Sequence, residues 1–167
     1  FDKLQADRVE QTAITLLAQV AEHWNIGSGA ARQFLTWAAR LHEIGLGIAH
    51  NHYHRHGEYI VGHADLPGFS RPEQQVLATL VRAHRRKFPS AKFVTLPHSW
   101  PETAERLAIL LRLAVALHRS RSPLPLPTLE LDVVKKELVL RFPIGWLIKH
   151  PLTQADLVTE RTYLETA

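Results

Sequence analysis

A proline-rich segment at residues 122–128 divides the sequence into two parts with different patterns. Pro123, Pro125 and Pro127 each fix their own φ angle and lack an amide hydrogen, so no helix continues through them. Before this segment, apolar residues recur every three or four positions; after it, they alternate with polar residues. We therefore predict a mainly α fold, with a helical bundle over 1–121 and a small α+β subdomain over 122–167.

Five helices are expected in the first part, at about 5–24, 30–43, 57–61, 70–86 and 99–119. Two of them begin with a serine that is followed three residues later by a glutamate, at Ser70 and at Ser99. This spacing is typical of a capping box, in which the serine and the glutamate each bond the backbone amide of the other. We expect both helices to begin in this way.

The second part predicts a β-hairpin followed by a helix. Leu129, Leu131 and Val133 alternate with polar residues, and a similar alternation follows the turn expected around Lys135–Glu137. The last helix is expected to begin at Thr153.

The composition excludes several classes of protein. The absence of cysteine rules out disulfides, thiolate zinc sites and thiol nucleophiles. No apolar run reaches about 18 residues and no signal peptide is visible, so we expect a cytoplasmic protein that does not enter a membrane. Because the sequence begins at Phe1 and contains no methionine, we expect it to be part of a longer protein with further domains.

The charge favours an anionic partner. The net charge is +4 before the 11 histidines are counted, which suits polyphosphate, a nucleotide or a nucleic acid, although solubility explains so modest a charge equally well. Four basic residues gather at the end of the fourth helix: Arg82, Arg85, Arg86 and Lys87. They are candidates for phosphate binding, or a solvated helix end placed favourably near the helix dipole.

Residues able to bind metal recur on the buried faces of successive helices. His42-Glu43, then His54 and His56, and then His84 follow one another along the chain. This order resembles the metal site of HD-domain phosphohydrolases, which implies an HD-domain-like bundle. Where that pattern has His, Asp and Asp, this sequence has the following residues: Gln5, Glu43 and Val115.

Because valine and glutamine are poor ligands, we predict that no metal binds and that the positions His42, Glu43 and His84 are degenerate. His42 and His84 are then core histidines, with Glu43 as their hydrogen-bond partner. The histidines between His50 and His56 form either a solvated loop or an anion or adventitious metal site.

Five segments in sequence order carry a resemblance to one family: 41–45 (LHEIG), 54–60 (HRHGEYI), 65–69 (DLPGF), 83–87 (AHRRK) and 141–147 (RFPIGWL). The chain resembles the C-terminal half of the exopolyphosphatases and guanosine pentaphosphate phosphatases. The resemblance implies upstream actin-like domains that bind Mg²⁺ and cleave terminal phosphates, and a helical part that lines a polyphosphate channel and contributes to a homodimer.

On this interpretation the chain has no catalytic residue and no cofactor of its own, and it is inactive alone. The residues that bind inorganic polyphosphate are expected to be these: Arg55, His56, Arg82, His84, Arg85, Arg86 and Lys87. The parent enzyme is an exopolyphosphatase or a guanosine pentaphosphate phosphatase, and the sequence leaves that choice open.

Two other functions also fit parts of the sequence. The first is a free-standing HD-type nucleotide phosphohydrolase, in which His42, Glu43, His84 and His56 activate water on a metal. The second is a nucleic-acid-binding module, suggested by the basic charge alone. No nucleic-acid motif is present, so we expect no nucleic-acid partner.

Overall fold

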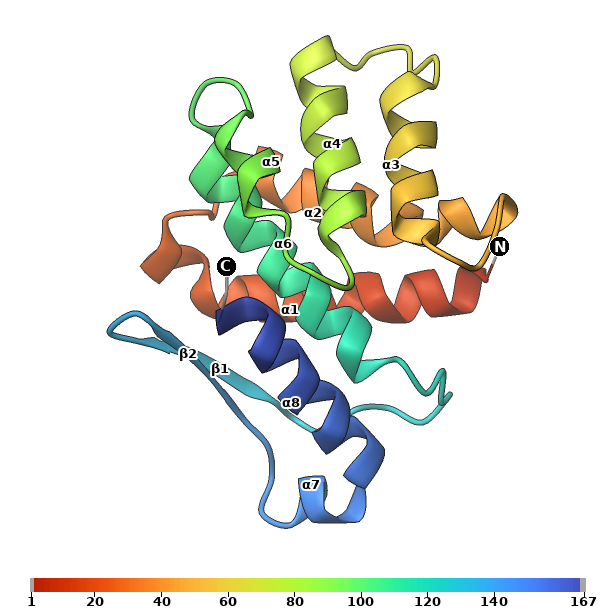
Figure 1. Ribbon diagram of the computed structural model, residues 1–167. Coiled ribbons are helices and arrows are strands. Elements are labelled where there is room, and N and C mark those ends of the chain that lie inside the picture. Colours follow the sequence, from red (N-terminus) through yellow and green to blue (C-terminus); the bar gives the residue numbers. More distant parts are fainter. Residues whose placement is uncertain (1, 166–167) are drawn as a thin grey trace.

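The computed structural model describes residues 2–165 (Figure 1). Its elements, in chain order, are α1 (Lys3–Trp24), α2 (Gly29–Leu41), the 3-10 helix η1 (Ile44–Gly47), α3 (Tyr53–His63), α4 (Arg71–Ala83), α5 (Ser90–Val94), α6 (Trp100–Leu117), β1 (Glu130–Val134), β2 (Glu137–Arg141), α7 (Trp146–Lys149) and α8 (Pro151–Glu165). The mainly α fold with a small hairpin is confirmed. The short helices α5 and α7 were not predicted, because four or five residues are too few to show a helical period.

The capping box predicted at Ser70 is present. Ser70 Oγ accepts a hydrogen bond from the Glu73 amide at 3.2 Å, and Glu73 Oε1 accepts one from the Ser70 amide at 2.9 Å. The capping box predicted at Ser99 is wrong, because no side chain caps the start of α6. Ser99 has a ψ angle of 8°, whereas a capping serine needs an extended backbone to aim its hydroxyl at the first helical amides.

Three predicted boundaries are also wrong. The third helix begins at Tyr53 instead of residue 57, so it takes in His54 and His56, which the sequence left in a loop. The fourth helix ends at Ala83 instead of residue 86. The last helix begins at Pro151, and Thr153 therefore lies inside it rather than at its start.

Helix α6 lies at the centre of the molecule (Figure 1). It packs against α1, α2, α4, α5 and α8. The stripe predicted to face inward is buried, and so are residues on its other sides, among them Ala108, Leu113 and Val115. A helix that is apolar all round belongs inside a core, and α8 covers the side that α1 and α2 leave open. No helix within residues 2–165 is both long and apolar enough to cross a bilayer.

The β-hairpin is fastened to α1. Gln19 donates from its side chain to the Leu129 carbonyl at 3.1 Å and accepts from the Leu131 amide at 2.7 Å. Leu131, on β1, is buried in the hydrophobic core and pairs with Leu140 on β2. The residues after the proline-rich segment thus share one core with those before it, and the boundary between 1–121 and 122–167 stays a prediction.

Arg112 is the largest fully buried side chain among the described residues. It donates to both carboxylate oxygens of Glu160 on α8, at 2.7 and 3.0 Å. Arg112 also donates to the carbonyls of Ala83 and Arg86, both at 2.6 Å, at the end of α4 and in the segment that follows it. One buried guanidinium thus joins the central helix, the last helix and the segment that follows α4.

Replacing Glu160 with glutamine should strongly destabilise the fold. Glu160→Gln leaves Arg112 buried without a counter-charge, and such a loss costs about 3–5 kcal/mol. The free energy of unfolding, measured by chemical denaturation, should fall by that amount. The matched control is Glu165→Gln, which breaks an exposed pair with Arg161 and should cost no more than about 0.5 kcal/mol. Equal losses in the two variants would contradict the assignment.

Candidate functional site

Two histidines meet where helices α2 and α4 end. His42 follows the last residue of α2, and His84 follows the last residue of α4. Each donates from Nδ1 to a carbonyl three residues earlier, on Ala39 and Val81, at 2.5 Å. Because a carbonyl only accepts, Nδ1 carries the proton and Nε2 is left as a lone pair in both rings. The ring centroids lie 5.1 Å apart.

His54 joins this pair from the first turn of α3. The centroid of its ring lies 6.5 Å from that of His84. A close approach of backbones brings it there, since Gly45 in η1 lies so near α3 that a Cβ atom would stand 1.9 Å from the Tyr53 carbonyl oxygen. Two buried nitrogens in this group have no hydrogen-bond partner, His84 Nε2 and His54 Nδ1. Of the two alternatives given for His54, the solvated loop is therefore wrong.

Burial keeps these imidazoles neutral. The pKa of His84 lies well below its usual value, because the ring is fully buried and His42 lies beside it. Burial also lowers the pKa of His42. Burial and the nearby Arg85 lower the pKa of His54 to about 4. At neutral pH the three imidazole rings are therefore uncharged, and they do not form a cationic site. Each ring keeps one nitrogen with a lone pair that can accept a hydrogen bond.

Glu43 does not bond these histidines, contrary to the prediction. Its carboxylate pairs with Arg121, which also pairs with Asp2 at 2.8 Å. The helix ends at Leu41, and the chain then turns into η1, which carries the Glu43 side chain toward the segment after α6. Glu43 is therefore committed to an arginine.

The other two degenerate positions serve packing. Gln5 is buried and donates to the His118 carbonyl at 2.7 Å, which ties α1 to the end of α6. Val115 lies in the apolar core. Within residues 2–165, no group of three or more His, Asp or Glu side chains is arranged to hold a metal ion. The expectation that no metal binds here stays a prediction.

The basic residues expected to bind phosphate lie in separate places. Arg82 is paired with Glu58 at 2.8 Å. Arg85 lies over the Tyr53 ring, with its guanidinium carbon 4.3 Å from the ring centroid. Arg86 and Lys87 are exposed in the segment after α4. Arg55 and His56 are on α3, and Arg55 lines a groove between α3, α4 and α5. His84, the seventh predicted residue, is buried beside His42.

Two arginines near Tyr53 were not among the residues predicted from the sequence. Arg119 and Arg121 follow the end of α6, and both lie within electrostatic range of Tyr53, as Arg85 does. The available signal was the Arg119-Ser-Arg121 run at a helix end, before the prolines. We name Arg85, Arg119 and Arg121, grouped around Tyr53, the arginine cluster.

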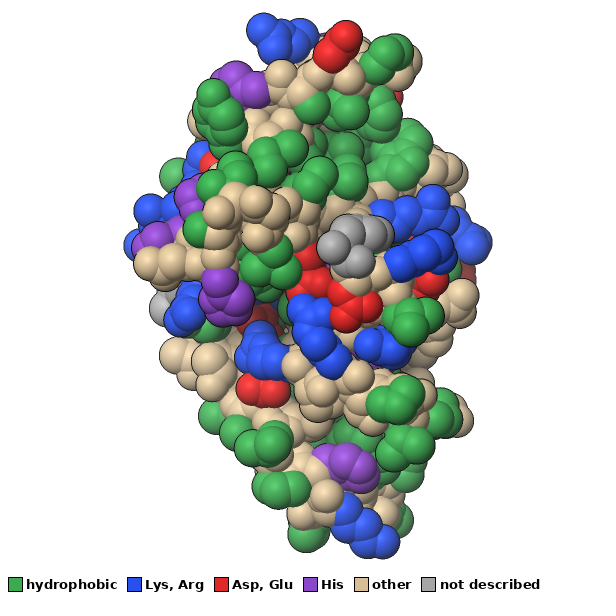
Figure 2. All heavy atoms as spheres, turned by 90° about the vertical axis from the view of Figure 1, so that its right-hand side faces the viewer, with side chains coloured by type: hydrophobic (Ala, Val, Ile, Leu, Met, Phe, Trp, Pro, Cys, Tyr) green, Lys and Arg blue, Asp and Glu red, His purple; other side chains and the backbone are tan. Residues whose placement is uncertain are grey.

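The electrostatics of the cluster are unbalanced at Arg85. Arg119 pairs with Asp156 at 3.1 Å, and Arg121 has its two carboxylates. No carboxylate pairs with Arg85 among the described residues; burial and the positive charges of Arg86 and Arg119 lower its pKa. Figure 2 shows the face that carries the N-terminal side of the fold, where Lys and Arg side chains surround a few acidic ones.

Comparison with known proteins shows which family the chain belongs to. The sequence model of the family described as Ppx/GppA phosphatase, domain III, matches residues 1–161. The chain belongs to the Ppx/GppA phosphatase family. It is similar to guanosine-5′-triphosphate,3′-diphosphate pyrophosphatases of Pseudoalteromonas atlantica, at 35% identity over 161 residues, and of Vibrio cholerae, at 36% over 163 residues. Each match covers 96% of this chain and 32% of the relative.

The chain therefore spans about a third of the length of these relatives. The predicted resemblance is confirmed, and the region corresponds to domain III of the Ppx/GppA family. The name of the Ppx/GppA family describes phosphatases.

The buried histidines should make stability depend on pH. In the unfolded chain a histidine has a pKa near 6.5, so below that pH the unfolded state takes up protons that the folded His42, His54 and His84 refuse. The free energy of unfolding should therefore fall as the pH drops from about 6.5 to about 4. His84→Asn should reduce this slope by up to about 1.4 kcal/mol per pH unit.

Denaturation curves at several pH values between 4 and 8 provide the measurement. The control is Val76→Ala, which makes a core cavity without removing a titrating group. It should lower stability at every pH and keep the wild-type slope. A His84→Asn slope equal to that of the wild type would show that His84 is protonated in the folded chain.

Proposed function

We propose that this chain is the helical, non-catalytic domain of a phosphoanhydride hydrolase and that its arginine cluster binds inorganic polyphosphate. The parent enzyme would release the terminal phosphate of the polymer. Hydrolysis and the Mg²⁺ that supports it would belong to upstream actin-like domains of the same protein. The isolated chain would then have no phosphatase activity.

The observation that carries the proposal is the unpaired charge of Arg85. A half-buried guanidinium with cationic neighbours and no carboxylate partner is electrostatically unfavourable, and a bound phosphate would relieve it. The contact with the Tyr53 ring restricts the Arg85 guanidinium, so less side-chain entropy is lost when an anion binds.

The neighbouring arginines are held ready by carboxylates. Arg119 is positioned by Asp156, and Arg121 by Asp2 and Glu43. A guanidinium has five donors, so Arg119 keeps donors for a phosphate oxygen beside its single pairing, and Arg121 keeps donors beside its two pairings. A polymer of phosphates can bond several arginines at once, and this favours a chain over a single phosphate.

The buried histidines support the proposal that hydrolysis belongs to other domains. A metal-dependent hydrolase of the HD type needs a carboxylate beside its histidines, and here Glu43 is paired with Arg121. The described histidines present neutral lone pairs without a carboxylate among them. The free-standing phosphohydrolase is accordingly the weaker interpretation.

A guanosine pentaphosphate phosphatase is the second candidate for the parent enzyme. The relatives cited above are named as pyrophosphatases of guanosine 5′-triphosphate,3′-diphosphate, and they resemble this chain along almost its full length. That nucleotide also carries phosphoanhydride chains, so the arginine cluster suits it by the same chemistry.

A homodimer is also part of the proposal, with a contact surface at the turn between β2 and α8. Three large apolar side chains are exposed along this stretch of the chain, which is costly in water: Ile144, Ile148 and Leu152. Replacing Ile148 with aspartate should shift the chain from dimer to monomer in light scattering after gel filtration. A dimer that survives Ile148→Asp, or a wild-type monomer, would contradict this contact.

Polyphosphate binding should depend on the arginine cluster and on salt. Arg85→Gln and Arg119→Gln should each weaken binding of a long polyphosphate about tenfold, since a hydrogen bond to a charged group contributes about 1.5–3 kcal/mol. Affinity should fall steeply as salt rises, because polyanion binding releases counterions. Calorimetric titration at several salt concentrations measures both effects.

Arg32→Gln is the matched control, because Arg32 is an exposed arginine on α2 outside the cluster. It should bind polyphosphate as the wild type does. The same titration with guanosine 5′-triphosphate,3′-diphosphate ranks the two candidate parents. If Arg85→Gln and Arg32→Gln bind polyphosphate equally well, the arginine cluster is not the site.

A further inference from the structure

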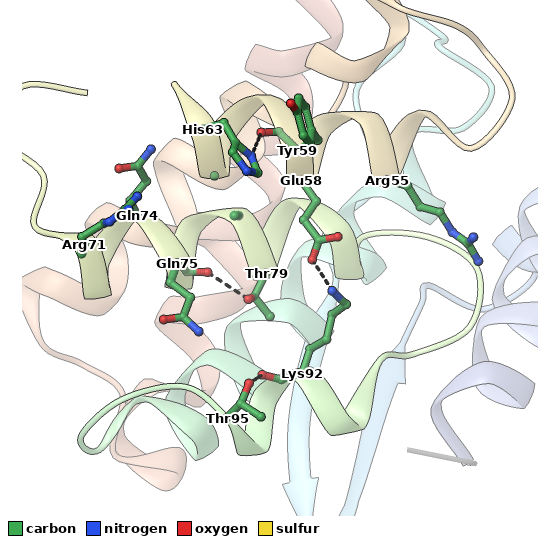
Figure 3. A pocket seen from close by; sticks show the side chains of 12 residues that line it. Arg55, Glu58, Tyr59, His63, Arg71, Gln74, Gln75, Thr79, Lys92 and Thr95 are labelled. Carbon is green, nitrogen blue, oxygen red and sulfur yellow. Dashed lines mark hydrogen bonds and ion pairs between the residues drawn. The ribbon is translucent and has the colours of Figure 1, made fainter. Parts of the chain in front are cut away.

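A polar groove of about 610 Å³ runs between helices α3, α4 and α5 (Figure 3), and no residue of the arginine cluster lines it. Helices α3 and α4 form its two sides and run antiparallel (Figure 1). Gly62 and Ala78 lie at the same level, since a Cβ atom on Gly62 would stand 3.7 Å from that of Ala78. Two small residues side by side leave the middle of the groove open to a ligand.

The groove carries net positive charge. Glu58 is the one carboxylate among the described residues that line it, and both of its oxygens are engaged, by Arg82 at 2.8 Å and by Lys92 at 2.7 Å. Arg55 and Arg71 line the groove as well and are exposed, and no carboxylate in the described part of the chain pairs with either of them. These two arginines are therefore available to bind a ligand with negative charge.

The two arginines lie at opposite ends of the groove, as Figure 3 shows. Each stands seven residues before the contact of Gly62 with Ala78, on helices that run in opposite directions. At about 1.5 Å per residue, Arg55 and Arg71 are about 10 Å to either side of that contact and about 21 Å apart along the helices. One small anion is too short to bond both, so the ligand is elongated and carries a negative group near each end.

The middle of the groove offers both donors and acceptors. Lys92 has three donors and uses one on Glu58, so two remain. The carboxamide of Gln75 is engaged by no other residue in the described part of the chain, so its amide protons and its oxygen are all available. Thr79 donates its hydroxyl proton to a carbonyl at 2.9 Å and keeps lone pairs, while the exposed Tyr59 hydroxyl can both donate and accept.

This pattern matches a peptide backbone. An extended chain presents one N–H donor and one C=O acceptor at each residue, and both kinds of group find partners between the two arginines. A polyphosphate has acceptors only, so it would leave the oxygens of Gln75 and Thr79 without donors and would place charge where the groove has no free arginine. We propose that the groove binds an extended acidic segment of another protein, with one acidic side chain on Arg55 and another on Arg71.

The geometry also fixes the spacing of the two acidic residues. At about 3.3 Å per residue, an extended chain covers about 20 Å in six residues, which is close to the separation of the arginines. Side chains alternate between the two faces of an extended chain, so residues six positions apart point the same way. Both carboxylates can then face the groove together, and each can pair with a guanidinium through two hydrogen bonds.

Titration with short synthetic peptides, followed by fluorescence anisotropy, tests the proposal. The spaced peptide has two glutamates six positions apart among alanines and serines. The adjacent peptide has the same composition and charge, with its two glutamates side by side. The spaced peptide should bind about tenfold more tightly, because only it reaches both arginines and a hydrogen bond to a charged group is worth about a factor of ten or more.

Variants of the chain locate the binding. Arg55→Gln and Arg71→Gln should each weaken the spaced peptide about tenfold and remove its advantage over the adjacent peptide. Gln75→Ala should weaken both peptides several-fold, since it removes contacts to the backbone. The matched control is Arg32→Gln, an exposed arginine on α2 outside the groove, which should change nothing. Circular dichroism of each variant checks that the fold is intact.

Several results would overturn the peptide site. They are an absence of peptide binding, equal binding of the two peptides, and binding that is indifferent to Arg55→Gln and Arg71→Gln. Peptide binding that is lost in Arg85→Gln but kept in Arg71→Gln would assign the peptide to the arginine cluster instead. If polyphosphate or single-stranded RNA binds more tightly than the spaced peptide and is lost in the same two variants, the groove is a polyanion site. Because no residue of the arginine cluster lines the groove, the peptide site stands or fails independently of polyphosphate binding there.

Discussion

The buried guanidinium of Arg112 is the constraint on which the rest of the structure depends. Buried away from water, its donors make four hydrogen bonds instead: two to Glu160, and two to the carbonyls of Ala83 and Arg86, at the end of α4 and just after it. A buried charge is tolerated only when its donors are satisfied in this way. The same bonds end α4 at Ala83 and hold the following segment, in which Arg86 has a positive φ of 64°. The place of Arg85 beside Tyr53 is therefore set from inside the core.

Local signals in the sequence predicted most of the helices. The Ser70–Glu73 capping box and the positions of α1, α2 and α6 follow from spacing alone. The end of α4 was missed because it is decided by Arg112, a residue 29 positions away from Ala83. Burial of α6 on all sides likewise depends on α8, which lies beyond the proline-rich segment. Interactions between residues distant in sequence have no local pattern to reveal them.

The histidines show a different limit of sequence reasoning. Residue type and spacing placed His42 and His84 in the core, and both are buried there. The sequence does not show that each ring donates to its own helix end, and this bond decides the tautomer and turns a lone pair inward. Nor does it show that Glu43 turns toward Arg121, since a single helical turn, η1, makes that difference. Chemistry at a site depends on orientation, which a list of residue types leaves open.

Helix α4 separates the two basic surfaces of the molecule. Arg82 and Arg85 are three residues apart, yet Arg82 pairs with Glu58 beside the groove, whereas Arg85 stacks on Tyr53 in the arginine cluster. Both contacts are made to α3, so the α3–α4 pair forms a wall of each surface. Glu58 balances the charge on the groove side, and Arg85 has no such carboxylate. Each surface thus keeps at least one arginine that no described carboxylate neutralises, Arg85 in the arginine cluster and Arg55 in the groove, and both surfaces can attract an anion.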